Sequence, residues 1–151
     1  AKPTSFFFDH AETTEIYIGG SWKFISLKYF HSVNDYFSVP HTSGSGYIDL
    51  SANYDLGGGW GINGHVGHLN FENYSNGRSN GDYTDWKLGV TKDISGWVFG
   101  AAYVGTNAKG SCTPNAAGLT QPYCFGNDAP GATGTKNAGR DTLIVSVSRT
   151  F

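Results

Sequence analysis

The stretch YIDLSANYDLGGGWGINGHVGH, residues 47–68, alternates between apolar and polar side chains on both sides of three consecutive glycines. In a β-strand, successive side chains point to opposite faces, whereas a helix would scatter these residues around its circumference. The stretch therefore predicts two strands joined by a turn at residues 57–59. The two faces of the first strand carry Ile48, Leu50, Ala52, Tyr54 and Leu56 on one side, and Tyr47, Asp49, Ser51, Asn53 and Asp55 on the other.

The same stretch contains Gly59-x-Gly61-x-x-Gly64, which has the spacing of a dinucleotide-binding loop. That fingerprint requires a helix after the glycines, so that the helix N-terminus meets the pyrophosphate. Alternation continues through this segment, so we interpret the glycine spacing as a chance match at the start of a strand. His65 and His68 lie three positions apart and would face opposite sides of a strand. We therefore predict no shared metal and a polar, pore-facing side chain for His65.

The period of two recurs along the chain, in YTDWKLGVTK (83–92) and LIVSVSRTF (143–151). It predicts seven strands, at residues 12–19, 22–32, 46–56, 60–71, 82–92, 97–107 and 140–151. Short connections (19–21, 57–59, 93–96) alternate with long ones (33–45, 72–81, 108–139). In an antiparallel up-and-down meander, this alternation places tight turns at one end and long loops at the other, as in transmembrane β-barrels. We expect an all-β chain forming part of such a barrel.

Tryptophans recur beside the short connections. Trp22, Trp60 and Trp97 are expected at equivalent strand starts after the turns, and Phe151 lies at the end of the sequence. An aromatic girdle at one level is typical of a membrane interface. The alternative, tryptophans in the core of a sandwich, does not predict their common position.

Composition limits the function classes. The chain has 151 residues, suited to one domain, with 10 Lys and Arg against 12 Asp and Glu, so that no basic surface for nucleic acid is expected. No apolar run is long enough for a transmembrane helix. Cys112 and Cys124 lie in the long segment 108–139, and we predict a disulfide across this surface loop rather than a metal site. A disulfide implies an oxidising compartment, and closing such a loop stabilises by about 3 kcal/mol.

Charged residues fall on the polar faces of the predicted strands. Because charges facing lipid are costly, we expect them to line a wet lumen. The alternative is that cross-strand ion pairs, such as Lys28 with Asp49, fill a narrow barrel. The pore-lining candidates are Glu15, Lys28, Asp49, Asp55, His65, Asp85 and Lys87.

Sequence motifs for catalysis are not found. We predict no catalytic residues, no cofactor and no enzyme activity. A Ser–His–acid arrangement, as in barrel-embedded lipid hydrolases, stays open because its members need not be close in sequence.

Four stretches, TTEIYIGGSWKFISLKYFHSVNDYF, YIDLSANYDLGGGWGINGHVGH, DYTDWKLGVTKDISGWVFGAAYVGTNA and GRDTLIVSVSRTF, resemble outer-membrane porins of the TorF family, also described by a Gcw-CHP domain. The resemblance covers residues 13–109 and 139–151 and leaves the cysteine-bearing loop outside. It implies an outer-membrane barrel of a Gram-negative bacterium with a transport role and no established binding residues. It also implies outer-membrane lipid and the barrel assembly machinery as partners, the latter through Phe151.

Family members carry a signal peptide and further strands before the position where this chain begins, and single-chain bacterial barrels close with an even number of strands. We therefore expect residues 1–151 to be the C-terminal part of one barrel, with N-terminal strands missing.

Three functions remain open. The first is a channel for small solutes in the outer membrane, with apolar residues facing lipid at Ile48, Leu50, Trp86, Leu88, Val145 and Val147. The second is an extracellular filament, a homo-oligomer in which the edges of an open sheet pair. The third is a soluble barrel that encloses a small apolar ligand.

Overall fold

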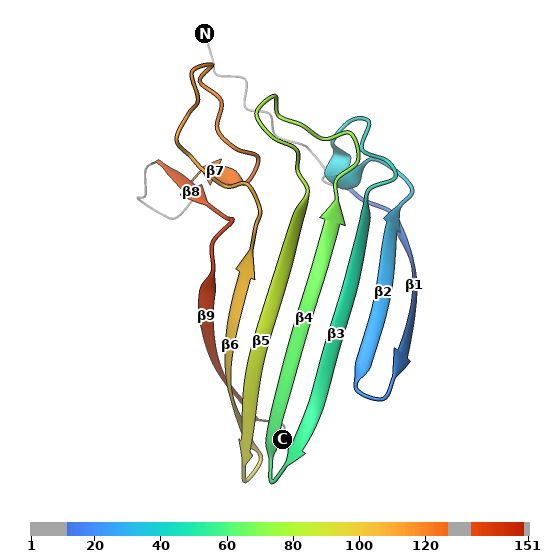
Figure 1. Ribbon diagram of the computed structural model, residues 1–151, viewed down its shortest axis with the longest axis vertical. Helices are drawn as coiled ribbons and strands as arrows, with labels where there is room; N and C mark the ends of the chain where they lie inside the picture. Colours follow the sequence, from blue (N-terminus) through green and yellow to red (C-terminus); the bar gives the residue numbers. More distant parts are fainter. Residues whose placement is uncertain (1–11, 127–133, 150–151) are drawn as a thin grey trace.

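The computed structural model describes residues 12–126 and 134–149, and its main element is an open antiparallel sheet (Figure 1). The sheet order is β1-β2-β3-β4-β5-β6-β9, which confirms the all-β meander of seven strands. Its strands are β1 (Glu15–Trp22), β2 (Ile25–Ser32), β3 (Gly46–Gly57), β4 (Trp60–Asn70), β5 (Tyr83–Ile94), β6 (Trp97–Thr106) and β9 (Thr142–Arg149). The sheet is not closed into a barrel, and β1 and β9 form its two edges.

Three two-residue turns join the strand pairs β1–β2, β3–β4 and β5–β6 at one end of the sheet (Figure 1). The turns expected at residues 57–59 and 93–96 are present, at Gly58-Gly59 and Ser95-Gly96. The turn expected at 19–21 is wrong, because these residues pair with β2 as part of β1 and the chain reverses at residues 23–24. Lys23 supplies the left-handed φ of 53° that this turn needs, a role usually given to glycine.

The long connections lie together at the opposite end of the sheet (Figure 1). They join β2 to β3, β4 to β5 and β6 to β9, so the expected asymmetry between short turns and long loops is confirmed. The longest connection carries its own small sheet of β7 (Cys124–Gly126) and β8 (Thr135–Asn137). The disulfide between Cys112 and Cys124 is present, with Cα atoms 5.2 Å apart.

A short 3-10 helix, η1 (Tyr36–Ser38), lies in the connection between β2 and β3. None of the helical segments in the described part of the chain has the length and hydropathy required to cross a membrane.

The three predicted girdle tryptophans all lie at the turn end. Trp60 and Trp97 begin β4 and β6, as expected, but Trp22 ends β1 rather than starting the next strand, because the first turn is displaced. Each ring has a cation above it, at 4.4 Å for Lys23, 4.8 Å for Lys92 and 5.0 Å for Arg149. The fourth predicted member, Phe151, lies outside the described residues.

The two faces of the sheet differ in chemistry. Register places apolar side chains of neighbouring strands side by side, for example Leu27, Leu50, Val66 and Trp86 along one row. This apolar face is open to solvent, as the exposed fractions of 62% for Leu88 and 75% for Val145 illustrate. Among the described residues, Leu69 is the buried hydrophobic side chain. The sheet therefore has almost no internal core.

The packed region of the protein lies at the loop end, around Leu69. Here the Phe71 ring stacks on Tyr74 at 4.4 Å between centroids and meets Tyr36 edge-on at 5.3 Å. Hydroxyl groups order the adjacent connection 33–45, since buried Thr42 donates to the Val39 carbonyl at 2.7 Å. The loops thus form a defined structure over one end of the sheet.

Candidate functional site

The polar face is organised around His65, in the middle of β4. Its Nδ1 lies 3.2 Å from Asp49 Oδ2 on β3, and its Nε2 lies 2.7 Å from Asp85 Oδ1 on β5. The ring therefore bridges carboxylates on both neighbouring strands. A neutral imidazole carries a single N–H, so donation to both carboxylates at once requires the imidazolium form.

Tyr47 completes this group from β3. Its hydroxyl donates to Asp85 Oδ2 at 2.9 Å and lies 3.2 Å from His65 Nε2. The side chain reaches across the intervening strand because β4 has glycine at position 67, between Asp49 and Asp85 in the register. A Cβ at Gly67 would collide with the Tyr47 hydroxyl and ring. We call the four residues Tyr47, Asp49, His65 and Asp85 the histidine cluster.

Ser51 brings a hydroxyl to the same cluster, so that serine, histidine and carboxylates meet. Its Oγ donates to Asp49 Oδ1 at 2.7 Å and lies 3.3 Å from His65 Nδ1. The serine proton is thus directed to a carboxylate rather than to the imidazole, which is not the hydrogen bond that activates a nucleophilic serine.

A cleft of about 470 Å³ opens beside the histidine cluster, toward the loop end. Its floor includes His65, Asp85 and Lys87 from the sheet, and Tyr83 and Tyr123 form an aromatic wall. The two tyrosine rings meet edge-on, with centroids 5.5 Å apart. Burial raises the pKa of Tyr123, with smaller contributions from neighbouring tyrosines and Asp82. The Tyr123 hydroxyl therefore stays a neutral donor, and it donates to the Gly81 carbonyl.

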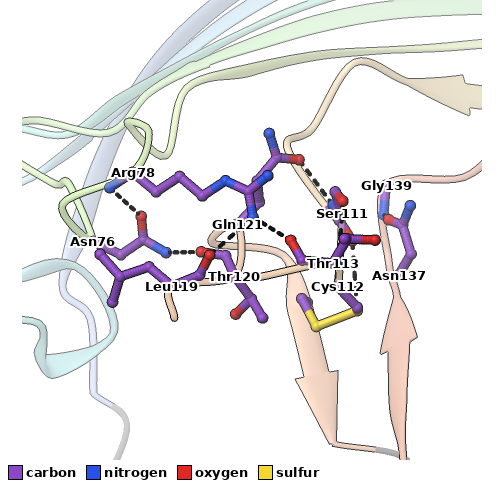
Figure 2. Close-up of a disulfide and its surroundings, with 12 residues drawn as sticks. Asn76, Arg78, Ser111, Cys112, Thr113, Leu119, Thr120, Gln121, Asn137 and Gly139 are labelled. Carbon is purple, nitrogen blue, oxygen red and sulfur yellow. Dashed lines mark hydrogen bonds between the residues drawn. A yellow bond between two sulfur atoms is a disulfide. The ribbon is translucent and has the colours of Figure 1, made fainter. Parts of the chain in front are cut away.

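The disulfide-bearing connection contributes Ala108, Tyr123, Ala138 and Arg140 to the lining of the cleft. It is fastened to the connection between β4 and β5 (Figure 2). Arg78 Nη1 donates to the carbonyl oxygens of Thr113 at 2.6 Å and Leu119 at 2.9 Å. Asn76 donates to the Thr120 carbonyl at 2.8 Å, as Figure 2 also shows. These contacts, with the disulfide between Cys112 and Cys124, hold the segment that carries Tyr123 in place.

The comparison with family models covers nearly the whole chain. A family described as "Bacterial protein of unknown function (Gcw_chp)" matches residues 2–151. The chain belongs to this family. The match includes the cysteine-bearing loop, which the sequence resemblance leaves outside. No curated protein and no solved structure matches the chain.

In this Gcw_chp chain, the register places all seven predicted pore-lining residues on the polar face. It brings three of them, Asp49, His65 and Asp85, into direct contact, and Lys87 is the register partner of His65. Lys28 lies opposite Asp49 as expected, but the Asp49 carboxylate pairs with His65 instead. The remaining two, Glu15 and Asp55, lie in other rows of the sheet, away from the cluster.

The sequence does not identify Tyr47, Tyr83, Tyr123 or Arg140 as site residues. Tyr47 has a usable signal, since it lies on the same face as Asp49 and Ser51. Tyr123 and Arg140 come from the long connection, where no periodicity indicates which way a side chain points.

Among the described residues, no group of three or more His, Cys, Asp or Glu side chains could hold a metal ion. His65 and His68 face opposite sides, as expected.

Proposed function

We propose that this Gcw_chp protein forms the wall of an outer-membrane β-barrel and conducts small polar solutes. The observation that carries the proposal is the exposed apolar face of the seven-stranded sheet, opposite a polar face. Burying a large apolar side chain is worth about 1.5–3 kcal/mol, so a continuous face of such residues is stable only when it is covered. Hydrocarbon would cover it without requiring a second packed layer.

The strand lengths support a membrane location. The four central strands β3 to β6 contain 12, 11, 12 and 10 residues. A tilted strand needs about 9–11 residues to cross the hydrocarbon layer. The central sheet is therefore long enough to span a bilayer.

The turn end has the chemistry of a membrane–water interface. Trp22, Trp60 and Trp97 lie at one level, and each is accompanied by a Lys or Arg within 5.0 Å of its ring. Tryptophan prefers the headgroup region, and long cationic side chains extend from there into water. This level would mark one membrane boundary, with the turns on the periplasmic side.

The strand directions set a condition for closing the barrel. All six pairings are antiparallel, so β1 and β9 run in the same direction. A barrel in which every pair is antiparallel therefore needs an odd number of additional strands between β1 and β9. A second copy rotated about the barrel axis would not satisfy this condition, because it would meet the first in parallel seams. That these strands belong to an N-terminal part of the same protein stays a prediction.

The polar face would line the lumen of such a barrel. It carries the histidine cluster and the cleft that the long connection helps to line, and its residues are accessible to water-soluble molecules. Lumen-facing residues tune selectivity in barrels of this kind.

A second candidate function, an extracellular filament, is favoured by the two sheet edges, which have no partner strand within residues 12–126 and 134–149. β1 and β9 each contain eight residues, all of them exposed, and an exposed edge is a template for pairing with another chain. Edge pairing alone would leave the apolar face uncovered, so the filament would also have to stack its sheets.

Reconstitution of the full-length protein tests the proposal. Refolded protein should produce discrete conductance steps in planar bilayers, whereas the same detergent without protein should not. A protein that gives no conductance, stays folded without detergent and forms elongated particles in electron micrographs would contradict the channel and support the filament.

A further inference from the structure

The cleft beside the histidine cluster combines charge and aromatic surface in a way that favours one class of ligand. Lys87 projects from β5, and Arg140 lies just before β9; both line the cleft. Within residues 12–126 and 134–149, neither side chain makes an ion pair or a hydrogen bond. Two cations without partners therefore face the same space.

The acidic group that lines the cleft is already engaged. Asp85 accepts from His65 through Oδ1 and from Tyr47 through Oδ2. Asp49, behind it, is engaged by His65 and Ser51. These hydrogen bonds orient the carboxylates toward the histidine cluster and away from an incoming molecule. The histidine cluster thus holds acidic groups in place while the cations remain available.

The aromatic wall adds a surface for a flat molecule. Tyr83 and Tyr123 meet edge-on, and both rings line the cleft, where they offer apolar surface to a planar group. Arginine and lysine bind carboxylates through charge-assisted hydrogen bonds, which are the strong ones in proteins. The volume of about 470 Å³ suits a small molecule.

We infer that the cleft binds small organic anions that carry a carboxylate on a planar apolar body. Lys87 and Arg140 hold the carboxylate. As a statement about which solutes the channel conducts, the inference rests on the proposed function. Binding itself can be measured without transport. Lys87 and Arg140 would then determine specificity for anions over neutral molecules of the same shape.

Benzoate is a suitable probe, and benzamide, which has the same ring without the charge, is its control. Titration calorimetry on the folded full-length protein in zwitterionic detergent should show saturable binding of benzoate and at least tenfold weaker binding of benzamide. Lys87→Gln and Arg140→Gln should each weaken benzoate binding about tenfold or more, because each removes a hydrogen bond to a charged group. Lys136→Gln, an exposed lysine on β8 outside the cleft, should leave binding unchanged.

Circular dichroism of each variant separates lost binding from lost folding. Equal affinity for benzoate and benzamide, no binding of millimolar benzoate, or an equal effect of Lys136→Gln would overturn the inference. The channel is tested apart from it: a conducting protein that ignores benzoate contradicts only the anion site, and a silent protein that binds benzoate contradicts only the channel.

Discussion

The hydroxyl of Tyr47 donates to Asp85 across a strand that contributes neither residue, over a distance of 2.9 Å. The contact is possible because Gly67 of β4 presents no side chain where the tyrosine ring crosses. The absence of a side chain at this one glycine thereby allows Tyr47 to link β3 to β5 on the polar face. It also determines how closely the histidine cluster can pack.

Gly67→Ala should disrupt this contact. The added methyl group would collide with the Tyr47 hydroxyl, which must move away from Asp85, and overpacking of this kind costs about 1–3 kcal/mol. Urea unfolding in detergent measures the loss. Gly64→Ala is the matched control in the same strand, because its Cβ would meet the Lys87 carbonyl at an ordinary 3.7 Å. Equal stability of the two variants would show that the crossing is not tightly packed.

Leu88→Arg tests which face meets lipid. Leu88 lies on the apolar face and is 62% exposed, so in a bilayer the arginine would replace a lipid contact at a cost of about 2–4 kcal/mol. Asn53→Arg, in the adjacent row on the polar face, should insert normally because its side chain would enter a wet lumen. Folding yield into lipid vesicles, followed by resistance to protease, compares the two. If both arginines are tolerated equally, the apolar face does not meet hydrocarbon.

The depth of the tryptophans tests the predicted membrane boundary. The chain has four tryptophans, so replacing three at a time by Phe gives single-tryptophan proteins. Quenching by brominated lipids should place Trp22, Trp60 and Trp97 at one shallow level. Trp86 lies six positions along β5 from Lys92, the partner of Trp60, or about 20 Å along the strand, and should report a different depth. Absence of quenching at all four positions would favour the filament.

Most of the sheet can be predicted from the sequence, because alternation with a period of two fixes both the strands and their faces. The end of β1 cannot, since the left-handed turn is made by Lys23 while Gly19 and Gly20 remain in the strand. Local composition favours a glycine turn, but pairing with β2 carries the strand on to Trp22.

The candidate site is only partly predictable for a different reason. Spacing places Asp49, His65 and Asp85 on one face, and the contacts among them follow from register. The register alone does not show that Asp49 pairs with His65 rather than with Lys28, because this choice depends on how far each side chain reaches across the strands. The contribution of Tyr123 depends on a loop that is fixed by the disulfide at the neighbouring Cys124 and by Arg78, which is far from Tyr123 in sequence.

Stability should fall at high pH through Tyr36 in the connection between β2 and β3. Burial, with smaller effects of Glu15 and Tyr83, raises the pKa of Tyr36 to about 12 from the ordinary value of 10.0. Since the folded pKa is the higher one, this contribution is fully present below about pH 10 and is lost as the pH rises toward 12. Urea unfolding across this range measures the decrease, which Tyr36→Phe should reduce. A decrease of the same size in the variant would mean that other groups cause it.

The disulfide should act locally, on the connection that lines one side of the cleft. It closes a loop between residues 12 apart in sequence, a constraint of about 3 kcal/mol in the chain-entropy model. Near the disulfide, the backbone N–H of Ser111 donates to Gln121 Oε1 at 2.8 Å, and the backbone N–H of Gln121 donates to the Ser111 carbonyl at 3.0 Å. Replacing Cys112 and Cys124 together by Ser should accelerate hydrogen exchange at these two amides and leave β4 and β5 unchanged. Reduction of the wild-type protein should reproduce the effect, while the double-serine variant should not respond to reductant. Faster exchange throughout the sheet would instead show that the disulfide supports the whole fold.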